Sequence, residues 1–262
     1  DRIGNEGVRF TSSFVANSIS GPSRACMLTG KHSHANGFIN NSTTFNGDQL
    51  TYPKLLQQNG YQTAMIGKWH LVSDPQGFDH WEILPGQGDY YNPTFIQMNG
   101  ERVQVEGYAT NIITDKAIDW IENQRDESKP FCMLLHHKAP HRTWMPDTCD
   151  LELFADKTFP LPENFYDNYE GRLAAQKQEM NIAKNMGLVY DLKMADKEKE
   201  ISDGIYEYWG HDMYNGNRMN PAQKAAWDAH YAPIIEKFKK DKLTGKALAE
   251  WKFQQYMRDY LR

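Results

Sequence analysis

The sequence is short of cysteine, of long hydrophobic runs and of net charge. Its 262 residues include only three cysteines, at positions 26, 132 and 149, which are too few and too scattered for a disulfide framework or a zinc site. No apolar run approaches the roughly 18 residues of a membrane-spanning helix. The formal charge of −5 indicates no general surface for nucleic acid, so an anionic ligand must be held by a local cluster of basic side chains.

The most informative stretch is SGPSRACMLTGK at Ser20–Lys31. The apolar run before it, Val8–Val15, predicts a strand, and Pro22 suits the first turn of a helix that Gly30 ends. Ser20 would stand between the strand and the helix, where free backbone N–H groups and the helix dipole favour anions. That position suits a nucleophile that attacks an anionic ester. It is also the position of a serine that only caps a helix, the commoner use of such a turn.

A second candidate site follows an apolar run at Thr63–Ile66. This run suits a buried parallel strand, and ligands of α/β proteins bind at the carboxyl ends of such strands. Lys68 and His70 come just past that end and alternate along the chain, so both can project to one side. The spacing fits an exposed lysine and a histidine packed beside Trp69 equally well.

The densest cationic cluster of the chain is HHKAPHR at 136–142. It follows a short apolar strand predicted over residues 130–135. Lysine and arginine are interleaved with the histidines, and such clusters more often bind anions than metal ions.

Residues 73–95 form an expected loop that is rich in aromatic, aspartate and asparagine residues. Aromatic rings stack on pyranose rings and carboxylates bind sugar hydroxyls, so the loop is a candidate sugar site with Asp89 as a contact. A well-ordered surface loop explains the same composition.

These stretches resemble three signatures of the type I sulfatase family. The first signature is Cys or Ser, then x-Pro-Ser-Arg, then Leu-Thr-Gly and a basic residue, and Ser20–Lys31 matches it. The second, Gly-Tyr-x-Thr-x-x-x-Gly-Lys-x-His, matches Gly60–His70, and the third, a strand followed by x-x-Pro-His, matches His141. The resemblance covers most of residues 1–150. It points to serine-type bacterial glycan sulfatases of the N-acetylglucosamine-6-sulfatase and heparan-sulfatase group.

The resemblance implies that a formylglycine-generating (anaerobic sulfatase-maturating) enzyme oxidises Ser20, and that the protein hydrolyses sulfate esters on glycans, O-sulfated amino sugars among them. His70 would orient the formylglycine hydroxyl, and His141 would protonate the leaving sugar oxygen. The expected catalytic residues are Ser20, Arg24, Lys68, His70 and His141, and the expected substrate contacts are Lys31, Lys68, Asp89, His141, Arg142 and Trp144.

The resemblance also implies Ca²⁺. A calcium site needs about six or more oxygen ligands, mostly carboxylates, and a modified Ser20 supplies only a small part of them. The Asp pairs of the family find no match here, so we expect the other ligands to lie outside the chain and the chain to lack both ends. Ser202-Asp203-Gly204 resembles a late metal motif only superficially, because it follows a charged run rather than a buried strand.

The implied fold is α/β, an alkaline-phosphatase-like α/β/α sandwich with a mixed, mostly parallel and incomplete sheet, plus a helical insertion. We expect a partial catalytic domain over residues 1–160 and a helix-rich insertion over 161–262, with helical runs at 173–186, 221–240 and 245–261. The charge runs at 193–200 and 237–242 are expected to be solvated helix faces. A periplasmic or secreted location is implied by the resemblance alone.

Two other functions fit the same residues. One is a phosphodiesterase or phosphonate monoester hydrolase of the same superfamily, because anionic ester sites share lysine, histidine and a hydroxyl nucleophile. The Pro-Ser-Arg string after Ser20 argues against it. The other is an inactive, truncated sulfatase homologue that binds glycans.

Overall fold

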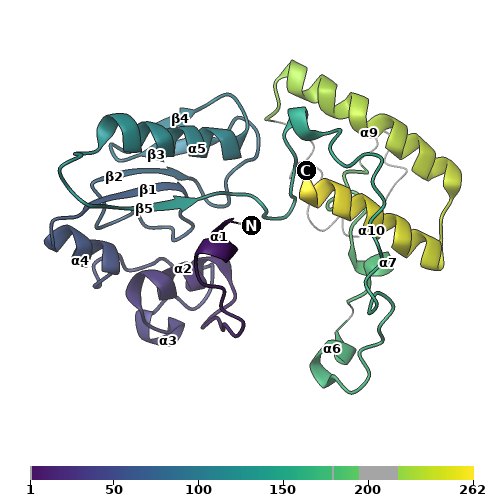
Figure 1. Cartoon of the computed structure of the whole chain (residues 1–262), viewed down its shortest axis with the longest axis horizontal. Coiled ribbons are helices and arrows are strands. Elements are labelled where there is room, and N and C mark those ends of the chain that lie inside the picture. The colour runs from purple at the N-terminus through teal and green to yellow at the C-terminus, as the bar shows by residue number, and fades with distance from the viewer. Residues whose placement is uncertain (1, 179, 195–217) are drawn as a thin grey trace. The chain divides into compact units, whose positions relative to one another are not determined.

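The structure, a computed structural model, describes residues 2–178, 180–194 and 218–262 (Figure 1). It divides into two compact units, the first formed by residues 1–89 and 93–138 and the second by residues 90–92 and 139–262. The expected functional division, with a catalytic part up to residue 160 and an insertion after it, stays a prediction.

The first unit is built around a sheet that, within the described residues, has five strands in the order β4-β3-β2-β1-β5. The central strand β1 pairs in parallel with β2 and β5, whereas β3 pairs antiparallel with β2 and β4. The expected mixed sheet is therefore confirmed, but the described strands show no parallel majority, because two pairings are parallel and two are antiparallel. The strands are β1 (Gln62–Lys68), β2 (His80–Leu84), β3 (Thr94–Gln97), β4 (Arg102–Gln104) and β5 (Phe131–His136).

Helices cover both faces of this sheet, with α5 on one side and α2 and α4 on the other (Figure 1). The helices of the first unit are α1 (Arg2–Glu6), α2 (Ser20–Thr29), α3 (Ser33–Asn36), α4 (Tyr52–Gln58) and α5 (Ala109–Asp119), which continues as the π-helical turn η1 (Trp120–Gln124).

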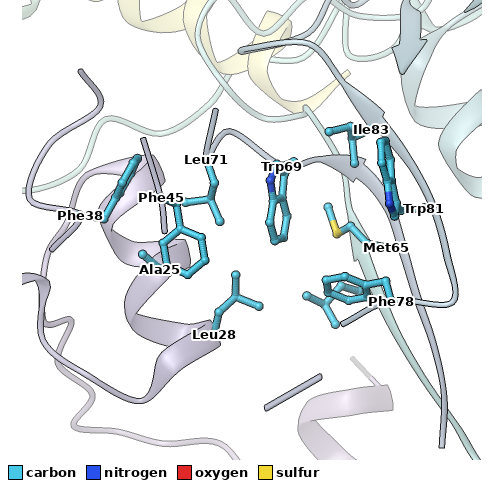
Figure 2. Packing of buried hydrophobic residues seen from close by; sticks show 11 residues of the cluster. Ala25, Leu28, Phe38, Phe45, Met65, Trp69, Leu71, Phe78, Trp81 and Ile83 are labelled. Carbon is cyan, nitrogen blue, oxygen red and sulfur yellow. The ribbon is translucent and has the colours of Figure 1, made fainter. Parts of the chain in front are cut away.

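The two sides of β1 build two separate hydrophobic cores. Successive side chains of a strand point to opposite faces. Met65 accordingly packs in one cluster with Ala25 and Leu28 of α2 (Figure 2), whereas Ala64 and Ile66 belong to another cluster with residues of α5. The α/β fold class with helices on both faces of the sheet is therefore confirmed.

Two local predictions for the first unit are wrong. The run Val8–Val15 pairs with no strand of the described chain, and its side chains are exposed, Phe14 to 94 %. Without a partner strand, its backbone N–H and C=O groups cannot form the hydrogen bonds of a sheet. Residues 73–95 are not one loop, because β2 and the start of β3 fall inside them. Trp81 and Ile83 are buried and alternate with Glu82, as a half-buried strand requires.

The second unit is helical, as the composition predicts. Its described helices are the 3₁₀ turn η2 (Thr148–Asp150), α6 (Leu173–Lys177), α7 (Ile182–Asn185), α9 (Pro221–Asp241) and α10 (Gly245–Leu261). Pro221 occupies the first position of α9, behind a capping box formed by Asn220 and Gln223. Two short helices stand within the run expected at 173–186. No described helix is long and apolar enough to cross a membrane.

Lys193 is not on a solvated helix face. Its side chain is buried, and Nζ donates a hydrogen bond of 2.7 Å to the carbonyl oxygen of Asp191. Residues 195–200 of that charge run, and Ser202-Asp203-Gly204, lie outside the described residues.

Candidate active site

Ser20 is the first residue of α2, and its hydroxyl faces a histidine. The N-cap position belongs to Ile19, and Gly30 ends the helix in the left-handed conformation. Ser20 Oγ lies 2.9 Å from Nδ1 of His70. Ser20 therefore does not act as the helix cap, and its hydroxyl is paired with a group that can hold or accept a proton.

The close approach of His70 to α2 depends on Gly21. A Cβ atom at this position would lie 2.5 Å from Cε1 of Phe38 and 3.0 Å from the carbonyl oxygen of His70. The Gly21 N–H donates to Oδ1 of Asn41 at 3.0 Å. His70 itself has a positive φ of 57°, a conformation that is uncommon for residues other than glycine and clusters at functional sites.

Lys68 ends β1 as a buried cation. Its side chain is 4 % exposed, and Nζ donates a hydrogen bond of 2.5 Å to Oε1 of Gln87. Burial, together with the positive charges of Arg24 and Lys138, lowers the pKa of Lys68 to about 8. The ammonium group is still protonated at neutral pH, and a neutral amide is a partner that an anion can replace.

Arg24 lies one helical turn after Ser20 and joins α2 to the ends of two strands. Its NH1 group donates to the carbonyl oxygen of Lys68 at 2.8 Å and lies 2.8 Å from Nδ1 of His136. Arg24 and Ser20 line the same open pocket, whose volume is about 600 Å³. The other residues of its lining are Val15, Ser18, Ile19, Ser23, Met27, Leu135, His136 and His137.

Lys138 also belongs to this region, although the sequence signatures do not include it. It is 8 % exposed, and Nζ donates to the carbonyl oxygen of Gln87 at 3.2 Å. Burial lowers the pKa of Lys138 to about 8, and the charge of Asp89 opposes this shift. Lys68 and Lys138 thus bind the same glutamine. Lys138 lies in the basic cluster HHKAPHR at 136–142. The cluster itself indicates anion binding, but within it only the family resemblance distinguishes one basic residue from another.

Three expected site residues belong to the second unit. Arg142 forms an ion pair with Asp191 and lies 4.7 Å from the ring centre of Tyr190. Trp144 packs against two tyrosine rings of α10. The backbone oxygen of His141 accepts a hydrogen bond of 2.5 Å from the Tyr90 hydroxyl. The convergence of His141 with Ser20 and Lys68 stays a prediction, as do substrate contacts by Arg142 and Trp144.

The described residues do not by themselves form a calcium site. Among them, no three histidine, cysteine, aspartate or glutamate side chains lie close enough to share a metal ion. Ser20 would contribute a single position to a cation that needs about six or more oxygen ligands. The Lys31 side chain is exposed.

Comparison with known proteins identifies the family of the chain. The Sulfatase family model matches residues 1–260. The chain therefore belongs to the sulfatase family, and its α/β fold is that of sulfatase structures.

The chain is similar in sequence or structure to three known proteins. The chain is 54 % identical, over its whole length and 46 % of the relative, to an N-acetylglucosamine-6-O-sulfatase of Bacteroides thetaiotaomicron. The human N-acetylglucosamine-6-sulfatase is 28 % identical over 62 % of this chain and 34 % of its own length. The structure of BT4656 in complex with its substrate D-glucosamine-2-N,6-O-disulfate superposes with a TM-score of 0.88 and 53 % identity, over 99 % of this chain and 52 % of that one. The chain thus spans about half the length of the first of these relatives and of BT4656.

Proposed function

We propose that the protein containing this chain hydrolyses sulfate esters on glycans, and that residue 20 supplies the nucleophile after oxidation to formylglycine. The observation that carries the proposal is the 2.9 Å contact between Ser20 Oγ and His70 Nδ1 at the start of α2, beside a pocket that Arg24 also lines. A serine hydroxyl is a weak nucleophile without activation. A hydrated aldehyde carries two hydroxyls on one carbon, so one can attack sulfur and the other can then expel sulfate.

Four basic side chains have a chemical task in this proposal. His70 orients a hydroxyl of residue 20 and holds or accepts its proton. Lys68 exchanges its bond to Gln87 for a sulfate oxygen, and its positive charge stabilises the charge that develops during the reaction. Arg24 holds the modified residue from within its own helix. His141 protonates the leaving sugar oxygen.

We propose a 6-O-sulfated glucosamine unit as the substrate. The Bacteroides relative is named an N-acetylglucosamine-6-O-sulfatase, and BT4656 was solved with a 6-O-sulfated glucosamine. Asp89, Lys31, Arg142 and Trp144 are the proposed sugar-side contacts. We further propose Ca²⁺ as the metal, modification by an anaerobic sulfatase-maturating enzyme, and a bacterial periplasmic or secreted location.

The experiment is mass analysis of the peptide containing residue 20. The full-length protein is produced with and without a maturating enzyme, and Ser20→Ala and Ser12→Ala variants are produced alongside. Oxidation of the serine alcohol to an aldehyde removes about two mass units, and hydration of that aldehyde adds about eighteen. We expect the modified mass and release of sulfate from glucosamine 6-O-sulfate in the native and Ser12→Ala proteins only. An unmodified Ser20 in an active protein would contradict the proposal, as would an inactive protein with complete modification.

A further inference from the structure

We propose that His136 is a positioning residue, whose Nδ1 accepts a hydrogen bond from Arg24 and fixes the guanidinium beside residue 20. This inference rests on the proposed function, because it concerns how Arg24 is held for that reaction. His136 ends β5, and Arg24 and Ser20 lie on α2. The contact therefore joins the nucleophile helix to the sheet.

The geometry assigns the tautomer of His136. An arginine guanidinium can only donate hydrogen bonds, so Nδ1 of His136 must accept at the observed 2.8 Å. The ring proton then sits on Nε2. Nδ1 also lies 3.2 Å from the carbonyl oxygen of Lys68, but without a proton on Nδ1 this contact is no hydrogen bond. The two hydrogens of Arg24 NH1 are thus shared between Lys68 O and His136 Nδ1.

The surroundings of His136 keep its ring neutral. Arg24 and His136 line a small cavity of about 50 Å³ with Leu28, Trp69 and Leu134 among the other lining residues. Burial, followed by the positive charge of Arg24, lowers the pKa of His136 to about 4, while the carbonyl oxygen of Lys68 works in the opposite direction. A protonated ring would place two donors against each other. The acceptor state is therefore the stable one at neutral pH.

The backbone brings the three groups together. Gly67, next to Lys68 in β1, has a φ of +104°, and a Cβ atom there would lie 2.0 Å from the carbonyl oxygen of His136. Only glycine allows this approach of β1 to the end of β5. As a result, the Lys68 carbonyl oxygen and the His136 ring form one acceptor pair for NH1.

Anchoring through NH1 leaves the rest of the guanidinium to the pocket. In the part of the chain that the structure describes, no hydrogen bond engages Nε or NH2 of Arg24. Arg24 is four residues after Ser20, so the two side chains share one face of α2. A long flexible side chain loses conformational entropy when it is ordered. Two acceptors that order it before substrate binds make its remaining donors ready for an oxygen on residue 20 or on the ester.

The kinetic test compares two substitutions in the full-length, matured protein. Asparagine places Oδ1 close to the former Nδ1 and keeps an acceptor, whereas leucine keeps the volume and removes it. We expect His136→Leu to lower kcat by about 10- to 100-fold, a range typical of a misplaced catalytic group, and His136→Asn to recover most of that loss. Formylglycine content and thermal midpoint are measured for each variant. Equal loss in both variants at full modification and unchanged midpoint would overturn the proposal.

A double substitution tests whether His136 acts through Arg24. If it does, His136→Leu adds no further loss of kcat to an Arg24→Lys protein. If the two residues act independently, the fold-losses of kcat of the two single variants multiply in the double variant. A second readout needs no activity. ¹⁵N NMR of the imidazole at pH 7 should show the proton on Nε2 and an unprotonated Nδ1, and a proton on Nδ1 would overturn the proposal. An inactive native protein with the expected tautomer would instead contradict the proposed function alone.

Discussion

The hydroxyl of Ser20 lies 2.9 Å from Nδ1 of His70, although 50 residues separate them in the chain. The contact joins the first turn of α2 to the segment just after β1, where ligands of parallel sheets bind. A serine at a helix start is common, but a serine whose hydroxyl is paired with a histidine instead of a backbone N–H group has a chemical use.

Loss of the His70 ring should lower turnover without preventing modification of Ser20. We expect His70→Ala to lower kcat by about 10²- to 10⁴-fold, because the general acid–base contribution of one side chain has that size. Sulfate release is measured together with the formylglycine content. His34→Ala, a change at an exposed histidine on α3, is the matched control and should behave as the native protein does. Similar losses in both variants would show that His70 has no special role.

The pH dependence should follow Lys68. Because its pKa is lowered to about 8, the free enzyme loses this cation above that pH, and kcat/KM, which reports on free-enzyme groups, should fall. Lys68→Arg, which keeps its charge to much higher pH, should remove that alkaline limb. If kcat/KM of the Lys68→Arg variant still falls near pH 8, a group other than Lys68 causes the decrease.

The same shift makes an opposite prediction for stability. Between pH 8 and the ordinary lysine value of 10.5, the unfolded chain binds more protons at this position than the folded one, so the contribution of Lys68 to stability rises with pH. Urea unfolding of the native and Lys68→Met proteins at pH 7 and 10 measures this contribution. We expect the free energy of unfolding of the native protein, relative to that of the variant, to be higher at pH 10. A lower relative value at pH 10 would contradict a lowered pKa.

Gly21 should be needed for both stability and turnover. Gly21→Ala places a methyl group 2.5 Å from the Phe38 ring and 3.0 Å from the His70 carbonyl oxygen, and we expect it to lower the free energy of unfolding by about 1–3 kcal/mol, as overpacking does. Turnover should also fall, because His70 is displaced. Gly30→Ala is the control: it strains a positive φ but meets no atom within 4 Å, so it should reduce stability while kcat stays unchanged. If kcat is the same in both variants, Gly21 is not needed to place His70, and the prediction is wrong.

Asp191 should stabilise the second unit through Arg142. Its side chain is 2 % exposed, accepts from Arg142 and also accepts from the Gly187 N–H at 2.7 Å. Breaking a buried ion pair costs about 3–5 kcal/mol, and we expect about 2 kcal/mol for Asp191→Asn because Arg142 is partly exposed. Asp228→Asn, at an exposed pair with Lys224, should cost less than about 0.5 kcal/mol. Urea midpoints compare the two, and equal effects would show that the buried pair contributes no more than the exposed one.

Several helices and strands of both units could be predicted from local patterns. The helix over Ser20–Thr29, its end at Gly30, the strand Gln62–Lys68 and the helix begun by Pro221 each follow from apolar periodicity and terminal residues that act within a few positions. Strand β2 is hard to predict, because glycine and aromatic residues surround the short alternation of Trp81, Glu82 and Ile83. The apolar content of Val8–Val15 predicts a strand, but apolar content alone does not provide the partner strand that a sheet requires.

The site was predictable where its residues follow one another and not where they meet across elements. Arg24, Lys68 and His70 lie in continuous signatures. The roles of His136 and Lys138 depend on β5 lying beside β1 and on Gln87 reaching both lysines, and no local pattern states which strands are neighbours. The pairing of Arg142 with Asp191, 49 residues away, has the same cause.

The most direct measurement is the product released from two matched esters by the full-length, matured protein. Glucosamine 6-O-sulfate and glucosamine 6-phosphate are compared in the native protein and in Ser20→Ala. We expect inorganic sulfate from the first ester, at a kcat/KM at least about 100-fold above that for phosphate release, and no sulfate from Ser20→Ala. Sulfate release that survives in Ser20→Ala, or a preference for the phosphate ester, would contradict the assignment of residue 20 as the nucleophile of a sulfatase.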